Sequence, residues 1–248
     1  MADPNFILHP SSLIPSNSLP GLDALVNRQE PAISAFLSGK NLGLLSNQTG
    51  FTRDDQPALE ALRGEGFNFL ALFSPEHGPS GTLEGEIASS KLEDQTPIFS
   101  LYGATKRPTP VMLRGLDAIV CDLQDVGARF YTYSSTLFEV MEACAPLGIA
   151  VVVLDRPNPL GGLPGEGPLM EPHLMSFIGA APLPVTHGCT MGELALFYRD
   201  WKGLEVEVQI APVQNWTRAT KWPQTGLKWR QPSPNLPEFG SAAWYPGL

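Results

Sequence analysis

Short, almost wholly apolar runs alternate along this chain with stretches in which the apolar residues recur at helical spacing. The apolar runs have the length of strands and lie at 41–45, 67–73, 97–101, 117–121 and 149–154. The intervening patterns predict helices over 54–65, 109–113, 130–145 and 190–200. Continuous apolar runs, rather than alternating ones, indicate strands that are buried on both faces. The predicted fold class is therefore α/β, a mainly parallel sheet with helices on both faces.

Local signals refine several of these boundaries. Asp54 or Asp55 could cap the helix predicted over 54–65, and Thr190 with Glu193 has the spacing of a capping box. Residues 204–210 alternate between apolar and polar positions, as expected of an edge strand. Residues 1–20 are rich in Pro and Ser, which predicts an extended N-terminal arm.

Polar clusters follow four of the predicted strands. They read SNQTG at 46–50, SPEHG at 74–78, DLQDVGAR at 122–129 and DRPNP at 155–159. The carboxyl ends of parallel strands meet at one edge of the sheet, which is where such folds bind ligands. We therefore expect the four clusters to converge on one site.

Glu76 and His77, in the SPEHG cluster, form the strongest candidate for catalysis. A carboxyl group at the rim of an apolar strand is partly desolvated, which suits a general acid. The alternative is that Glu76 caps a nearby helix and His77 only packs. Glu166 and Glu171 lie on a predicted loop, where a lone carboxylate is more often a solvated charge.

Two further side chains each have two interpretations. Arg129 could bind a substrate carboxylate through two hydrogen bonds, or could form an internal ion pair with Asp122 or Asp125. Asp155 could contact a ligand, or could cap the turn that follows its strand.

The composition narrows the classes of function. The 248 residues carry a net charge of -9 at pH 7, which argues against nucleic acid or an anionic membrane surface as a partner. Three cysteines form no disulfide framework, and four scattered histidines without a ligand motif make a zinc site improbable. The chain has no glycine-rich phosphate-binding motif. We therefore expect no cofactor and no metal, and we find no run long enough to cross a membrane.

The motifs together resemble one family. GLLSNQTG, ALFSPEHG, SLYG, LDAIVCDLQDVGARFYTY, VVLDRPNPLGG, EGPLMEP, HGCTMGELALFY, TGLKWRQPSPNLP and WYPG occur in one order over residues 21–248. They are similar to the exo-β-N-acetylmuramidases, glycoside hydrolase family 171, formerly a domain of unknown function. The resemblance implies a Rossmann-like domain over 21–212. It also implies a linker and the start of a smaller auxiliary domain over 213–248.

The resemblance further implies an activity and a set of site residues. The expected reaction releases terminal N-acetylmuramic acid from the non-reducing end of peptidoglycan fragments. Glu76 is expected to be the catalytic acid and Glu166 its partner, with Asp125 and Glu171 as rivals, unless the acetamido group of the substrate serves instead. Arg129 or Arg156 would suit the lactyl carboxylate. The expected substrate-binding residues are Asn47, His77, Gln124, Asp125, Arg129, Tyr131, Asp155, Arg156, Asn158 and His187.

The chain also departs from the family pattern. Pro79-Ser80-Gly81 replaces an apolar residue, Arg and Gly, and Lys228 and Arg230 stand where apolar residues are usual. Cys189 occupies a position that is often Met. The chain stops at Leu248, where family members continue, so we expect a truncated auxiliary domain. No export signal is visible at the N-terminus, whereas family members are often exported.

Two other functions remain open at this stage. A shortened cleft could hold muramyl sugars without cleaving them, which would make the protein a binding module. A Rossmann-like scaffold that serves a partner protein is the third interpretation.

Overall fold

The computed structural model describes residues 17–81 and 88–247, and its centre is one mixed sheet. The strands of the described chain are ordered β3-β4-β2-β1-β5-β6-β7. Neighbours are parallel throughout, except that β3 is antiparallel to β4. The strands are β1 (Asn41–Ser46), β2 (Asn68–Ser74), β3 (Ser90–Lys91), β4 (Pro97–Ser100), β5 (Ala118–Asp122), β6 (Ala150–Leu154) and β7 (Val208–Ala211).

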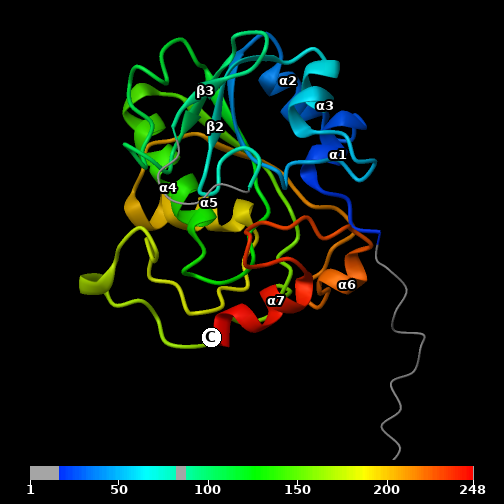
Figure 1. The fold of residues 1–248 in the computed structure, drawn as a ribbon, viewed down its shortest axis with the longest axis vertical. Helices are drawn as coiled ribbons and strands as arrows, with labels where there is room; N and C mark the ends of the chain where they lie inside the picture. Colours follow the sequence, from blue (N-terminus) through cyan, green and yellow to red (C-terminus); the bar gives the residue numbers. More distant parts are fainter. Residues whose placement is uncertain (1–16, 82–87, 248) are drawn as a thin grey trace, which may run out of the picture.

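Helices cover both faces of this sheet (Figure 1). The helices α1, α2 and α3 lie on one face, α4 and α5 lie on the other, and α6 and α7 lie below the edge where the parallel strands end. Their bounds are α1 (Gly21–Val26), α2 (Pro31–Leu37), α3 (Ala58–Gly64), α4 (Thr132–Cys144), α5 (Met191–Lys202), α6 (Trp222–Thr225) and α7 (Phe239–Trp244). Short 3₁₀ turns occur at η2 (Ala145–Leu147), η3 (Pro172–Leu174) and η4 (Tyr245–Gly247).

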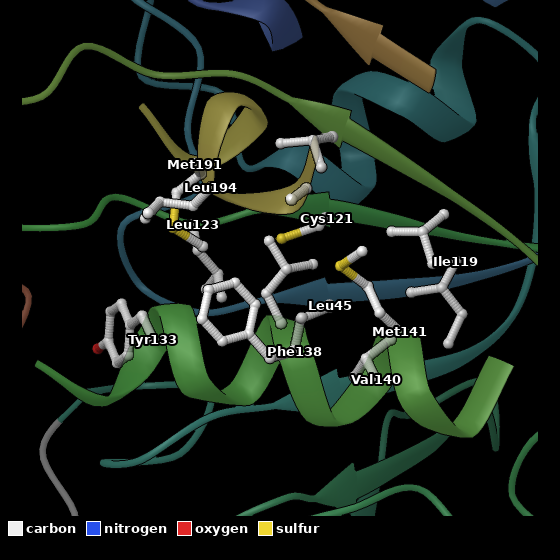
Figure 2. Close-up of a cluster of buried hydrophobic side chains, with 14 of the residues drawn as sticks. Leu45, Ile119, Cys121, Leu123, Tyr133, Phe138, Val140, Met141, Met191 and Leu194 are labelled. Atoms are coloured by element: carbon white, nitrogen blue, oxygen red, sulfur yellow. The ribbon is translucent and has the colours of Figure 1, made fainter. Parts of the chain in front are cut away.

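The central strands divide the apolar residues between two cores. Side chains alternate between the faces of a strand, so Ile119 and Cys121 of β5 join one core while Ala118 and Val120 join the other. The first core lies between the sheet and α4 with α5, where Phe138 contributes to the packing in Figure 2. The second core lies under α1, α2 and α3. Burial on both faces explains why these strands read as continuous apolar runs.

The structure confirms the α/β class and most of the predicted elements. Each of the five predicted strands is present, with ends shifted by one residue or so. Thr190 accepts a hydrogen bond from the Glu193 backbone and Glu193 reaches back to Thr190, so the capping box of α5 is confirmed. The alternating stretch 204–210 contributes β7, which lies at the edge of the sheet as predicted.

Two local predictions are wrong. Residues 109–113 form a turn rather than a helix, with Leu113 N–H donating to Thr109 at 3.2 Å, because the segment ends at Gly115 before a further turn can form. Neither Asp54 nor Asp55 caps α3, which begins after Pro57. Asp55 instead pairs with Lys228 and Arg230.

The ends of the chain bear on the predicted domains. Residues 1–16 of the predicted arm lie outside the described residues. Leu19 N–H donates to the Gln214 carbonyl at 2.8 Å and Ser18 N–H donates to the Thr225 carbonyl at 3.1 Å, so the described end of the arm is paired with the segment before α6 and with the last residue of α6. The domain boundary near 212 stays a prediction. In the described part of the chain, no helix has both the length and the apolar character needed to span a bilayer.

The contact between α4 and α5 generates a stability prediction. The ring of Phe138 stacks on that of Tyr198, with centroids 3.9 Å apart and planes 5° apart, and Phe138 is 1% exposed. Phe138→Ala should lower the free energy of unfolding by about 3–5 kcal/mol, because it leaves a cavity in the core. Urea denaturation followed by circular dichroism measures this change.

Phe197→Ala is the matched control, because Phe197 is on the same helix as Tyr198 but is 37% exposed. Its loss should stay below about 1 kcal/mol, as for most surface substitutions. Equal losses for the two variants would contradict the assignment of Phe138 to the core.

Candidate active site

The polar clusters gather at the carboxyl edge of the sheet, as the parallel pairing requires. Ser46 at the end of β1 lies beside Asp122 at the end of β5, and Ser74 at the end of β2 lies beside Ser100 at the end of β4. The clusters continue from the ends of β1, β2 and β5, and the DRPNP cluster continues from the end of β6, which pairs with β5. The strand register therefore brings residues from distant parts of the sequence to one edge.

Glu76 lies half-buried in a tight turn after β2. The next residue, His77, has a φ of 68°, a left-handed conformation that is uncommon for residues other than glycine. The Thr132 hydroxyl, at the first position of α4, donates to Glu76 Oε2 at 2.5 Å. Interaction with the Glu76 carboxylate raises the pKa of Tyr102 to about 12, so the Tyr102 hydroxyl lies near that carboxylate. The Thr132 hydroxyl therefore orients the Glu76 carboxylate.

Two tyrosines connect the ends of the central strands to the C-terminal segment. The hydroxyls of Tyr131 and Tyr133 both donate to the Pro232 carbonyl, at 2.9 Å and 2.5 Å. Asn47 donates to the Tyr133 hydroxyl at 2.6 Å, and Gln48 donates to the same Pro232 carbonyl at 3.1 Å. One backbone carbonyl thus receives three donors, so the segment around it is held against the carboxyl edge.

The pKa of Tyr131 responds to two carboxylates of the candidate site. Burial raises the pKa of Tyr131 well above its ordinary value, and the charges of Asp125 and Glu76 add to the effect. Tyr245, whose ring lies 6.2 Å from that of Tyr131, has its pKa raised by burial and by the same two carboxylates. Glu76 and Asp125 are therefore close enough to act on the same aromatic groups.

Asp125 forms a buried pair with His187. His187 Nε2 lies 3.1 Å from Asp125 Oδ2, and the Gly127 N–H donates to the same oxygen at 2.7 Å. Burial lowers the pKa of His187, but the hydrogen bonds and charges of Asp125 and Cys189 together outweigh burial and raise the pKa. The Cys189 N–H points at Nδ1 from 3.2 Å, which favours the tautomer that carries its proton on Nε2. Among the described residues, the other oxygen of Asp125 is buried without a partner.

Arg156 forms a buried ion pair with Asp122. Its Nε and Nη2 contact the two carboxylate oxygens at 2.6 Å and 2.9 Å, and Nη2 also donates to the Phe51 carbonyl at 2.9 Å. Arg156 is 6% exposed. The pair joins the ends of β5 and β6 to the loop after β1. Most hydrogen-bond donors of this guanidinium are therefore occupied by groups of the protein.

Asp155 and Asn158 also have structural partners. Asp155 accepts hydrogen bonds from the backbone of Gly192 at 2.9 Å, in the first turn of α5, and of Arg156 at 3.1 Å. These bonds agree with the second interpretation of Asp155, in which it caps the turn that follows its strand. Asn158 donates to the Cys189 carbonyl at 2.9 Å and accepts from Leu160 N–H at 2.9 Å. Both residues thus organise the loops around the site.

Arg129 forms no ion pair with Asp122 or Asp125 in the described structure, so that interpretation is wrong. Its Nη1 donates to the carbonyls of Pro168 and Leu183, at 2.8 Å and 2.7 Å. Its Nε is buried without a partner among the described residues. Arg129 therefore holds the long loop after β6 against the start of α4.

The two glutamates of that loop are exposed. The backbone of Glu166 pairs with that of Thr186, next to His187, which brings Glu166 to the side of the Asp125–His187 pair. Glu171 Oε2 lies 3.5 Å from His173 Nδ1, and both side chains are largely exposed.

Gln124 donates to the carbonyls of Asp125 and Pro157, and its Oε1 is buried without a partner in the described chain.

Sequence reasoning missed Thr132 and Tyr102, the two neighbours of Glu76. Tyr102 stands in the SLYG motif just after β4, which pairs with β2, so strand order alone would have placed it near Glu76. Thr132 lies within the helix predicted over 130–145, and its sequence context gives no sign of a role in the site. Among the described residues, no group of three or more His, Cys, Asp or Glu side chains is arranged to hold a metal ion.

Comparisons with known proteins give consistent results. Residues 42–240 match a family described as exo-β-N-acetylmuramidase NamZ, N-terminal. The peptidoglycan β-N-acetylmuramidase NamZ of Bacillus subtilis (strain 168) is 39% identical over 230 residues, which are 91% of this chain and 55% of that protein. The chain therefore spans about half the length of this relative.

Two solved structures share the fold. Both are crystal structures of DUF1343 family proteins from Bacteroides fragilis NCTC 9343. The first has a TM-score of 0.83 and 35% identity, and covers 92% of this chain and 58% of its own. The second has a TM-score of 0.77 and 32% identity, and covers 92% and 60%.

The buried carboxylate of Asp155 generates a pH prediction. Burial raises its pKa from 3.8 to about 6, against the hydrogen bonds of Thr190, Gly192 and Arg156. The folded state therefore binds this proton more tightly than the unfolded state, and the associated stability is lost as pH rises through about 6. Asp155→Asn should gain stability relative to the wild type between about pH 4 and 6. Urea denaturation of both proteins across this range measures the difference.

Asp94→Asn provides a control of opposite sign. Hydrogen bonds from Thr96 lower the pKa of Asp94, so its contribution is lost as pH falls below the ordinary value. A difference between Asp155→Asn and wild type that does not change with pH would contradict the protonation of Asp155 near pH 6.

Proposed function

This chain belongs to the family of the N-terminal domain of exo-β-N-acetylmuramidase NamZ, and from this premise we propose that it is a glycoside hydrolase. The proposed reaction removes terminal N-acetylmuramic acid from the non-reducing end of peptidoglycan fragments. Its substrates are muramyl sugars, and neither nucleic acid nor membrane insertion is part of the proposal. The observation that carries it is the Thr132 hydroxyl that holds the Glu76 carboxylate, with Tyr102 nearby, at the edge where the strand ends meet.

Glu76 is the proposed proton donor to the departing sugar oxygen. Cleavage of a glycosidic bond generally uses one carboxyl group for this step and a second group as base or nucleophile. Glu76 is half-buried and oriented by Thr132, so it meets the positional requirement of a general acid. His77 adjoins it and would contact the same sugar.

Glu166 and Asp125 compete for the second role. Glu166 is exposed, and its backbone adjoins the loop that carries His187. Asp125 is 4% exposed, and one of its oxygens already serves His187 and Gly127. Its exposure favours Glu166 as the group that contacts a water or the sugar, whereas the buried pair of Asp125 and His187 has a structural role.

The remaining residues of the site would bind the sugar. Two arginines were considered for the lactyl carboxylate. Arg129 donates from Nη1 to loop carbonyls, and Arg156 donates from Nε and Nη2 to Asp122 and to the Phe51 carbonyl. Asn47, Gln124 and Tyr131 line or support the same edge.

Substitution of Glu76 tests the acid role. Glu76→Gln should lower kcat/KM on a muramyl-glucosamine disaccharide by about 10²–10⁴-fold, the usual contribution of a general acid. The loss should be much smaller on a nitrophenyl muramide, because nitrophenolate leaves without protonation. Steady-state kinetics on the two substrates gives the comparison.

Glu205→Gln is the matched control, because Glu205 is exposed and far along the chain from the site, between α5 and β7. It should leave both rates unchanged. An equal loss on both substrates in Glu76→Gln would assign Glu76 to the base or nucleophile role instead. Saturable calorimetric binding of the disaccharide to the wild type without turnover would favour the binding-module interpretation.

Substitution of Glu166 tests the second carboxylate. Glu166→Gln should lower turnover of both the disaccharide and the nitrophenyl muramide, because a base or nucleophile is needed whatever the leaving group. Glu205→Gln is again the control and should retain activity. Full activity of Glu166→Gln would transfer the role to Asp125, to Glu171 or to the acetamido group of the substrate.

A further inference from the structure

A small pocket beside the ends of β1, β5 and β6 is lined by an excess of cationic side chains. Four of them, from three separate parts of the chain, reach its wall, together with a single carboxylate, Asp55. The cations are Arg53, Arg156, Lys228 and Arg230. The pocket shares Gln124 and Arg156 with the candidate active site, whereas Glu76 is not part of its wall.

The carboxylates near the pocket do not neutralise these charges. Asp55 is shared, with one oxygen accepting from Lys228 and the other from Arg230. Asp122 pairs with Arg156, and the buried Asp23 also acts through its charge on Arg156 and Arg53, so three carboxylates stand against the four cations. Arg53 has no ion pair in the described chain and binds the Ser18 carbonyl at 2.5 Å. A chain of net charge -9 thus has a local excess of positive charge at this point.

The orientation of the guanidinium groups leaves donors for a ligand. The guanidinium carbon of Arg230 lies 3.8 Å from the centroid of the Phe51 ring, a cation–π contact that uses none of its N–H groups. Arg156 uses Nε and Nη2 internally, and its Nη1 has no hydrogen-bond partner among the described residues. Arginine donors arranged in a plane are suited to oxyanions.

The volume of the pocket limits the size of its ligand. It is about 110 Å³, and one water molecule occupies about 30 Å³ in the liquid. A group of four or five heavy atoms therefore fits. Gln124, which lines the pocket, also has a buried Oε1 without a partner in the described chain, and a ligand hydroxyl could donate to it.

We propose that this cationic pocket binds a small oxyanion, a phosphate or carboxylate group, through Arg156, Lys228 and Arg230. Two ligands could supply such an oxyanion, free inorganic phosphate or the carboxylate of a muramyl sugar. The pocket itself does not depend on the proposed hydrolysis, because the anion is recognised by charge and donor geometry alone.

Titration with inorganic phosphate tests the proposal on the unmodified chain. Trp222 lines the pocket, so its fluorescence should change with saturation in the millimolar range, and calorimetry should give one site per chain. Ionic strength is held constant with chloride, since salt weakens such binding. No saturable signal in either method would overturn the proposal.

Charge substitutions of opposite sign separate binding from folding. The double variant Lys228→Met with Arg230→Met should weaken phosphate binding at least about tenfold, whereas Asp55→Asn should strengthen it severalfold by releasing both cations. Lys202→Met, an exposed lysine on α5, is the control and should bind as the wild type does. Thermal unfolding by circular dichroism confirms that each variant is folded. Weaker binding in Asp55→Asn, or unchanged binding in the double variant, would contradict the assignment.

Competition identifies the source of the anion. N-acetylmuramic acid that displaces phosphate, while N-acetylglucosamine does not, would assign the pocket to the lactyl carboxylate and would support the proposal. Phosphate bound together with N-acetylmuramic acid would support a separate anion site. Displacement of phosphate by N-acetylglucosamine would overturn the proposal, because that sugar carries no carboxylate.

Discussion

Parallel pairing of β1 with β2 on one side and with β5 on the other determines where the polar residues of this protein can lie. Strands buried on both faces cannot carry polar side chains along their length, because an unpaired buried polar group is costly. Polar chemistry is therefore confined to the ends of the strands. The register then places the residues that follow β1, β2, β5 and β6 along a single edge, although they are far apart in the sequence.

The carboxyl edge is itself mostly buried, and that makes its polar groups depend on one another. Asp122 balances Arg156, Asp125 binds His187, and the Pro232 carbonyl accepts from Tyr131, Tyr133 and Gln48. Removing one member of a buried ion pair leaves the other without compensation, at a cost of about 3–5 kcal/mol. Such residues keep the edge in one geometry, while the half-buried Glu76 remains accessible to a ligand.

The sequence was informative about features that depend on local pattern. Continuous apolar runs predict the parallel sheet, the Thr190–Glu193 spacing predicts the cap of α5, and the strand-end clusters predict the edge that carries the site. Features that depend on distant partners could not be read in this way. The pairing of Asp55 with Lys228 and Arg230 joins residues more than 170 positions apart. Similarly, only the fold brings Tyr102 and Thr132 to Glu76, and only the fold shows that Arg129 binds loop carbonyls rather than an aspartate.

The left-handed backbone of His77 has a consequence for how this region tolerates change. A residue with a side chain costs about 1–3 kcal/mol in that conformation, whereas glycine adopts it freely. The chain nevertheless carries an imidazole there, next to Gly78, which has a φ of 71°. The turn after β2 thus holds conformational strain that a glycine at position 77 would release. Such a substitution would stabilise the turn but remove the imidazole of His77, so stability and the presence of this side chain are opposing demands.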